Sequence, residues 1–306
     1  MKNNIVVIGS SNVDLIMKMD HLPEKGETVT DAEFMQVYGG KGANQAVAAA
    51  RAGGRVAFVN CVGEDAYTPR MVENYRNDGI DTRFVFTERG MTSGHALVMI
   101  GDKGENYLSV DPGANYRLTP KRIDEAMPVI DDAAVIVMQY EIPEETIKYV
   151  IDYANKKTIP VLWNFAPART FDLSYTSKIN TLVVNELEAG YLAQMTIETE
   201  HDVEPTASKL LKGGIENVII TLGQNGAILV NGDETVRVPA FEVDAVDTTA
   251  AGDTFCGSFA VAYVEGKSFK EALRFASAAS AICVTRMGAQ PSVPKRKEID
   301  LFLADR

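Results

Sequence analysis

The stretch Asp247-Thr248-Thr249-Ala250-Ala251-Gly252-Asp253-Thr254-Phe255 places a carboxylate where a turn of small residues becomes a helix. The residues from Phe255 to Glu265 (FCGSFAVAYVE) are apolar or small, which predicts a buried helix beginning near Gly252. The first amides of such a helix have no partner within it and carry the positive end of its dipole. Because only alanine and glycine surround them, a phosphoryl group could approach the backbone closely.

A purely structural interpretation of this stretch stays open. Asp is favoured at the start of a helix, and Gly before it is common in any tight turn. On these residues alone, Asp253 fits a helix-start residue as well as a base beside a bound phosphoryl group. A second motif is therefore needed to decide between the two.

The charge of the chain argues against nucleic acid and anionic membranes as general partners. Its 306 residues contain 30 Lys and Arg against 42 Asp and Glu, a net charge of 30 − 42 = −12. The early apolar run from Ile5 to Ile8 is too short for a signal peptide or a membrane span. Cys61, Cys256 and Cys283 have no paired spacing, so neither a disulfide framework nor a zinc site is predicted. We expect a soluble protein of the reducing cytoplasm.

Apolar strands alternate with helices along most of the chain. Strands are predicted over residues 5–8, 56–61, 134–138, 160–163, 181–184 and 218–221, and helices over 43–52, 67–77, 144–156, 186–193, 207–211, 254–265 and 270–285. This rhythm predicts an α/β fold, with a mainly parallel sheet covered by helices on both faces. No linker or repeat interrupts it, so we expect a single domain over residues 1–306.

Two stretches break this rhythm, residues 15–37 and 93–111. In the second, the segments 95–100 and 107–110 flank Gly101-Asp102-Lys103-Gly104, a pattern typical of a β-hairpin. Neither stretch has a crossover helix beside it. We therefore expect both to form a small separate sheet over one end of the main fold, where it could act as a lid.

A second glycine-rich turn at a helix start is Gly39-Gly40-Lys41-Gly42-Ala43-Asn44-Gln45-Ala46. It lacks the spacing of a P-loop, and Gly9-Ser10-Ser11 after the first strand does not complete a dinucleotide-binding fingerprint. What remains is a turn that offers Asn44, Lys41 and backbone N–H groups, which suit a polyhydroxylated ligand. A plain glycine turn before an alanine-rich helix is the alternative.

These two motifs, together with five further segments, closely resemble the signatures of the ribokinase-like sugar kinase family. The other segments are Ser11-Asn12-Val13-Asp14, Gln139-Tyr140-Glu141, Asn185-Glu186-Leu187-Glu188, Thr221-Leu222-Gly223 and Val284-Thr285-Arg286-Met287-Gly288-Ala289-Gln290-Pro291-Ser292. Each is short, but seven in the same order over the whole chain form a specific signal.

The resemblance implies a Rossmann-like α/β core, a β-sheet lid that also serves as a homodimer interface, and transfer of the ATP γ-phosphoryl group to a sugar. By this similarity, the residues that hold the sugar hydroxyls are Asn12, Asp14, Gly40, Lys41, Asn44, Glu141 and Asp253. Carboxylates accept hydrogen bonds from hydroxyls, while Asn and Lys donate to their oxygens. Structural alternatives are turn residues for Asn12 and Asp14, a solvated surface charge for Lys41, and a helix N-terminal charge ahead of Pro143 for Glu141.

Phosphoryl transfer needs positioning, charge neutralisation and a base. The resemblance implies that Asp253 accepts the proton of the attacking hydroxyl, while the N–H groups of Ala250, Ala251, Gly252 and Asp253 stabilise the charge on the phosphoryl oxygens. Mg²⁺ would bridge the ATP phosphates largely through waters, oriented by Asn185 and Glu188. A helix cap with a charge in its first turn is the alternative for that pair.

The resemblance also implies positions for the nucleotide and for a monovalent cation. The nucleotide would contact Asn185, Glu188, Thr221, Gly223, Gln224, Asn225, Gly226, Gly252 and Ser277. Potassium would lie at Asp247, Thr249, Cys283, Arg286, Gly288 and Ser292, held mostly by main-chain carbonyl oxygens. Its effect would be to order the loop that presents the amides beside Asp253.

The expected activity is ATP-dependent phosphorylation of D-ribose at the 5-hydroxyl, giving ribose 5-phosphate and ADP. Kinases of another small sugar or nucleoside, such as deoxyribose, fructose or adenosine, remain alternatives. A non-catalytic sugar-binding relative is a third, although such a protein would have no need of a base at Asp253.

Overall fold

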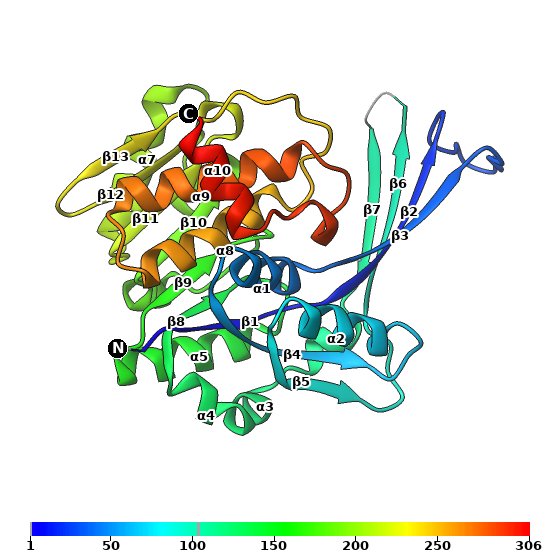
Figure 1. Cartoon of the computed structure of the whole chain (residues 1–306), viewed down its shortest axis with the longest axis horizontal. Helices are drawn as coiled ribbons and strands as arrows, with labels where there is room; N and C mark the ends of the chain where they lie inside the picture. The colour runs from blue at the N-terminus through cyan, green and yellow to red at the C-terminus, as the bar shows by residue number, and fades with distance from the viewer. Residues whose placement is uncertain (1, 103–104) are drawn as a thin grey trace.

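The computed structural model describes residues 2–102 and 105–306, and within them the strands form two separate sheets (Figure 1). The larger sheet has nine strands in the order β13-β12-β11-β10-β9-β8-β1-β4-β5. Its strands are β1 Asn4–Ile8, β4 Arg55–Gly63, β5 Asp81–Glu88, β8 Ala133–Met138, β9 Val161–Asn164, β10 Thr181–Asn185, β11 Asn217–Thr221, β12 Ala227–Asn231 and β13 Thr235–Val238. Every pair from β5 to β11 is parallel, and only β12 and β13 join antiparallel. The predicted fold class is confirmed.

Helices cover both faces of this sheet because its strands are buried on both sides. In β1, Ile5 and Val7 belong to one apolar cluster, and Val6 and Ile8 to another. The first cluster includes α1 Lys41–Arg51, α2 Thr68–Asn77, α8 Ala251–Val264, α9 Phe269–Val284 and α10 Arg296–Ala304; the second includes α3 Pro120–Glu125, α4 Met127–Ile130, α5 Glu144–Lys157, α6 Glu186–Ala193 and α7 Glu200–Lys212. None of the helices among the described residues is long and apolar enough to span a membrane.

The smaller sheet projects from one end of the main body, as Figure 1 shows. Its strands are β2 Asn12–Met19, β3 Glu33–Gly39, β6 Gly94–Gly101 and β7 Asn106–Asp111, in the order β3-β2-β6-β7. The prediction of a separate sheet and of a β6-β7 hairpin is confirmed. The sheet begins at Asn12 rather than at residue 15, and Lys103 and Gly104 of the predicted turn lie outside the described residues.

Some elements differ from the sequence prediction for identifiable reasons. Helix α7 begins at Glu200, not at residue 207, because Thr199 and Asp202 form a capping box and Pro205 is accommodated inside the helix. Strand β5, at the edge of the sheet, mixes polar and apolar residues and was not predicted. The hairpin of β12 and β13 was also missed, as was the amphipathic helix α10.

Close packing of α1 against its neighbours depends on two glycines. A Cβ atom on Gly42 would lie 2.4 Å from the backbone nitrogen of Ser10, so α1 starts directly against the end of β1. A Cβ on Gly257 in α8 would lie 2.5 Å from the carbonyl oxygen of Gln45. Without side chains at these points, the N-terminal turns of α1 and α8 come together.

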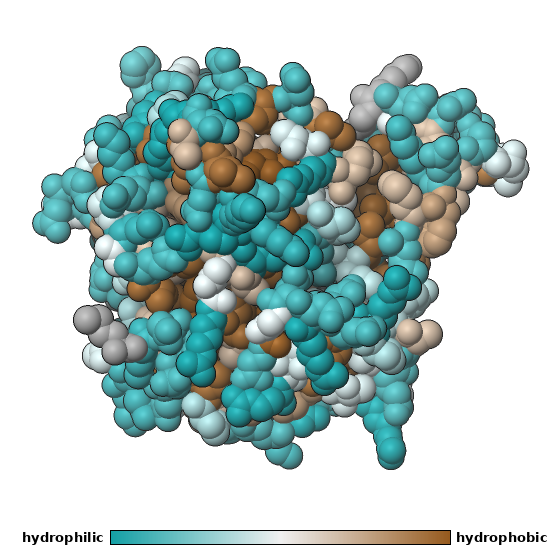
Figure 2. Space-filling model, viewed as in Figure 1, coloured by the Kyte–Doolittle hydropathy of each residue, from teal (hydrophilic) through white to brown (hydrophobic). Residues whose placement is uncertain are grey.

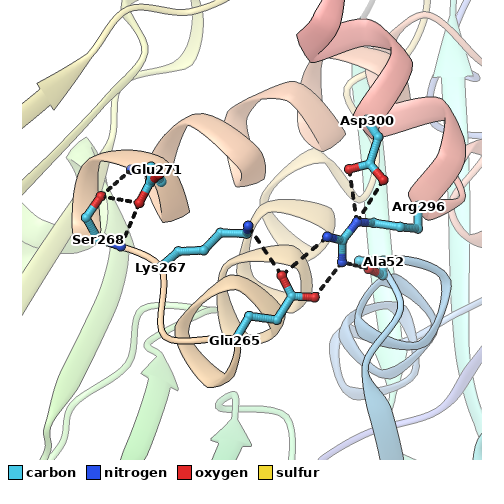
Figure 3. A network of polar contacts seen from close by, with 7 residues as sticks. All are labelled: Ala52, Glu265, Lys267, Ser268, Glu271, Arg296 and Asp300. Atoms are coloured by element: carbon cyan, nitrogen blue, oxygen red, sulfur yellow. Dashed lines mark hydrogen bonds and ion pairs between the residues drawn. The ribbon is translucent and has the colours of Figure 1, made fainter.

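A polar network ties α10 to the ends of α1 and α8 (Figure 3). The guanidinium of Arg296 donates to Glu265 after α8, to Asp300 in its own helix and to the carbonyl oxygen of Ala52 after α1. Lys267 adds a second cation beside Glu265 at 3.5 Å. The network fixes the C-terminal helix over the pair of helices that carries the motifs described above.

Candidate active site

The motif residues meet at one edge of the large sheet, where its parallel strands end. Gln139 follows β8, Asn164 and Asn185 end β9 and β10, and Thr221 ends β11. The carboxyl ends of parallel strands lie at the same edge, which is where open α/β sheets bind ligands. Helices α1 and α8 bring their N-terminal turns to this edge.

Asp253 lies in the first turn of α8 and is only 7% exposed. The side-chain amide of Asn44 donates to its Oδ2 at 2.9 Å, and the amide of Gln45 donates to its Oδ1 at 3.0 Å. Both donors stand at the start of α1. The two motifs singled out in the sequence are therefore in direct contact, and both oxygens of this carboxylate are oriented.

Gln45 is itself held by residues that the sequence did not place in the site. Its Nε2 also donates to Asn164 Oδ1 at 3.0 Å, and its Oε1 accepts from Gln139 Nε2 at 2.7 Å. All three side chains are buried. Gln45 and Gln139 belong to two of the sequence motifs, and this membership could have marked them as site residues. Asn164 belongs to none of the motifs.

Glu141 and Lys41 form the next part of the site. Glu141 accepts from the hydroxyl of Ser10 at 2.5 Å and from the backbone N–H of Lys41 at 3.0 Å, which anchors the start of α1. Burial acts to lower the pKa of Lys41, but the carboxylates of Asp253 and Glu141 raise it, and the result is a pKa above the ordinary value. The lysine is therefore a permanent cation beside these carboxylates.

Asp14 lies on β2 against the backbone of Gly39, where a Cβ would come within 2.2 Å of its Oδ2. Burial, with the nearby charges of Glu141 and Asp253, raises the pKa of Asp14 to about 7. The side-chain oxygen of Asn44 is a second acceptor in the site, because it is buried and has no hydrogen-bond partner among the described residues. The site thus contains acceptor oxygens that no protein donor satisfies, and a ligand with hydroxyl groups could donate to them.

The start of α8 presents backbone amides beside Asp253. Ala250 adopts the left-handed conformation, with φ 60°, which is uncommon for a residue other than glycine. The amide of Ala251 donates to Thr248 O at 3.2 Å, and that of Thr254 to Ala250 O at 2.8 Å. Among the described residues, no acceptor faces the amides of Ala250, Gly252 and Asp253, so three of the four expected amides are free and only that of Ala251 is paired.

Two adjoining pockets open at these amides. One, of about 220 Å³, is lined by Lys41, Asn185, Glu188 and the segment 250–253. The other, of about 680 Å³, includes the expected nucleotide positions Thr221, Gly223, Gln224, Gly226, Gly252 and Ser277 in its lining. They share Thr221, Thr248, Ala251 and Gly252. Asn225 belongs to the same turn, Gly223–Asn225, but does not line the pocket.

Asn185 and Glu188 form the capping box that was the structural alternative for them. Glu188 N donates to Asn185 Oδ1 at 2.8 Å, and Asn185 N donates to Glu188 Oε2 at 2.9 Å. Burial raises the pKa of Glu188, although the bond from Asn185 and the charge of Lys41 oppose this. Because the box uses one oxygen of Glu188, the other remains available to water around a hard cation.

The expected cation residues come from two loops that lie together. Asp247 accepts from Thr249 N at 2.8 Å and from Gly288 N at 2.9 Å. Although burial opposes it, these bonds hold the pKa of Asp247 below its ordinary value. Cys283 Sγ lies 3.0 Å from Ser292 Oγ. The side chain of Arg286 pairs with Glu298. Arg286 could therefore contribute only its main-chain carbonyl oxygen to a cation, and oxygen is the ligand that a hard cation prefers.

A family model described as pfkB family carbohydrate kinase matches residues 2–296. The chain belongs to this family of carbohydrate kinases. A ribokinase of Haemophilus influenzae is 38% identical over 303 residues, which covers 99% of each chain, and a deoxyribokinase of Salmonella typhi is 37% identical over 302 residues, covering 98% of this chain and 99% of the relative. The structure of Arabidopsis thaliana ribokinase complexed with ribose and ATP superposes with a TM-score of 0.93 at 34% identity, covering 99% of both chains.

The sequence resemblance leads us to expect Asp14 at the sugar, and its raised pKa would then make sugar binding by this kinase depend on pH. Below about pH 7 the carboxyl group is protonated and loses acceptor capacity, so KM for the sugar should rise about tenfold between pH 8 and pH 6, with a smaller change in kcat. Initial rates at varied sugar concentration and saturating ATP measure this. Asp14→Asn, which cannot titrate, should abolish the dependence; a wild-type KM that is flat across this range would contradict the assignment.

Proposed function

We propose that this kinase transfers the γ-phosphoryl group of ATP to the 5-hydroxyl of D-ribose. The observation that carries the proposal is the carboxylate of Asp253, which is buried, oriented at both oxygens and lies beside free backbone amides in the lining of the smaller pocket. Relatives named ribokinase and the ribokinase complexed with ribose and ATP support ribose as the acceptor. The relative named deoxyribokinase makes 2-deoxyribose the second candidate.

Asp253 would accept the proton of the attacking hydroxyl. The amides of Asn44 and Gln45 hold its two oxygens, so the carboxylate keeps one direction and remains an acceptor. Sugar hydroxyls would be bound by the backbone at Gly40 and by the side chains of Asn12, Asp14, Lys41, Asn44 and Glu141. Lys41 offsets the negative charge that these carboxylates gather.

The phosphates would lie between the amides of Gly252 and Asp253 and the side chain of Lys41, because these donors line the smaller pocket. Mg²⁺ would supply charge neutralisation there, and its waters fit the free oxygen of Glu188 and the amide of Asn185. The adenosine part of ATP would occupy the larger pocket, which Phe255, Ala281 and Val284 make partly apolar.

The small sheet is proposed to act as a lid within a single domain. Asn12 and Asp14 lie in β2 itself, so the sheet would supply side chains to the sugar site.

A location in the reducing cytoplasm is proposed from the cysteines. Cys61, Cys256 and Cys283 are all buried free thiols, which supports this location.

Asp253→Asn tests the chemistry. It should keep ATP and ribose binding, measured by calorimetry, while kcat falls at least about a hundredfold, because the amide cannot accept the proton. Asp233→Asn, in the exposed turn between β12 and β13, is the matched control and should retain full activity. A kcat within a few-fold of wild type would remove Asp253 from this role.

The acceptor is tested on the same preparation with ribose, 2-deoxyribose, fructose and adenosine. We expect the highest kcat/KM with ribose. Turnover of another acceptor with none of ribose would overturn the substrate assignment but keep the kinase. Binding of sugars without transfer to any of them would favour a non-catalytic relative.

A potassium ion is proposed to lie between the loops of Asp247 and Gly288, where main-chain carbonyls would hold it. It would order the loop that leads to Ala250, whose left-handed conformation is strained. Replacing KCl by NaCl at equal ionic strength should therefore lower kcat several-fold. Asp247→Ala, which releases both loops, should weaken this difference; equal wild-type rates in both salts would argue against the site.

A homodimer through the small sheet is proposed because both faces of that sheet are apolar. Cross-strand pairing aligns Phe34, Met17, Met99 and Tyr107 on one face, and Met35, Ile16, Val98 and Leu108 on the other. Phe34, Tyr107 and Leu108 are 59–61% exposed, and Figure 2 shows apolar surface over this part of the molecule. A second copy would cover such a surface.

Light scattering should give twice the mass of one chain for the wild type, and the mass of one chain for Tyr107→Glu, since a charge there would be buried at the interface. Leu301→Glu replaces a side chain of similar exposure on α10 and should remain dimeric. A monomeric wild type at micromolar concentration would refute the dimer.

A further inference from the structure

A buried pair of side-chain amides, Asn12 and Asn115, stands at the base of the small sheet. Asn115, in the 3-10 turn Gly113–Arg117 after β7, donates from Nδ2 to Asn12 Oδ1 at 2.9 Å. Asn115 is 2% exposed and Asn12 is 5% exposed. Asn115 appeared in none of the sequence motifs and touches neither pocket described above.

The orientation of the Asn115 amide is fixed by the backbone of Ser11. The N–H of Ser11 requires an acceptor and finds Asn115 Oδ1 at 2.8 Å; its carbonyl requires a donor and finds Asn115 Nδ2 at 3.1 Å. Reversing the amide would place like groups together at both contacts. Ser11 is in turn held through its hydroxyl by Asn60 at 2.6 Å and Tyr75 at 3.0 Å.

This arrangement determines which end of the Asn12 amide faces the sugar site. Because Oδ1 of Asn12 accepts from Asn115, its Nδ2 must point the other way, and no described residue accepts a hydrogen bond from it. Asn12 and Asp14 are two residues apart on β2, so their side chains lie on the same face. The site therefore presents an N–H donor next to a carboxylate acceptor.

We propose that Asn115 is a positioning residue for sugar recognition: it locks the amide of Asn12 so that the site offers a donor and an acceptor side by side. Each hydroxyl of a sugar both donates and accepts, so the pair of Asn12 and Asp14 suits two adjacent hydroxyls. This rests on the proposed function, in which Asn12 and Asp14 contact the sugar.

Gly94 supplies an independent observation for the same contact. A Cβ on this residue would lie 2.2 Å from Asn12 Oδ1 and 2.3 Å from Asn115 Nδ2, so the hydrogen bond passes directly over the glycine. Gly94 has no positive φ that would explain its presence by backbone conformation. The space is what its lack of a side chain provides.

A double-mutant cycle tests the proposal, with KM for ribose and calorimetric ribose affinity as readouts. Asn115→Ala should raise KM about tenfold and leave KM for ATP unchanged, because one oriented hydrogen bond to the sugar is lost. In the Asn12→Ala background, the same change should have less than about a twofold effect. An undiminished effect in that background, or an unchanged KM in the single variant, would overturn the proposal.

Gly94→Ala tests the contact without removing either amide, and it serves if Asn115→Ala does not fold. It should raise KM for ribose as Asn115→Ala does, while Gly232→Ala, where the added Cβ meets no atom within 4 Å, should leave KM unchanged. Equal KM values for the two glycine variants would contradict the inference. If ribose binds to the wild type but is not phosphorylated, the proposed function fails, whereas the calorimetric cycle still decides the role of Asn115.

Discussion

The pair of hydrogen bonds that the carboxylate of Asp253 accepts is the interaction on which the arrangement of this site depends. These hydrogen bonds join the start of α8 to the start of α1. The two donors, Asn44 and Gln45, precede Asp253 by 209 and 208 residues in sequence. The join is possible because Gly42 and Gly257 let α1 approach β1 and α8. Lys41 and Glu141 are placed relative to Asp253 through the start of α1, and the free amides through the start of α8, whereas Asn12 and Asp14 come from β2.

Local patterns predicted the elements of this fold better than they predicted their contacts. The buried strands and the helices α1 and α8 follow from apolar runs, and the two glycine-rich starts were recognised from small residues beside a polar one. Strand β5 was missed because at the edge of the sheet its residues are only half-buried.

The residues of the site likewise fall into those that the sequence motifs contained and those that only the folded structure brings in. Asp253, Asn44 and Glu141 stood in motifs, and the structure brings them together. Asn164 and Asn115 did not, because each acts through a partner more than a hundred residues away in sequence, at a contact that only the folded chain creates. Asn185 and Glu188 show the converse: a capping box and a ligand-binding pair use the same two residue types at the same spacing, so the sequence cannot separate them.

The small sheet is joined to the body at four places: before Asn12, after Gly39, before Gly94 and after Asp111. A segment held by one connection can turn about a single residue, but a sheet with four must bend all of them together. Any change in its tilt therefore acts as a hinge made of four backbone crossings, and Asn12, Gly94 and Asn115 stand within it. The residues that we propose to bind or position the sugar therefore lie at the connections about which the sheet would tilt.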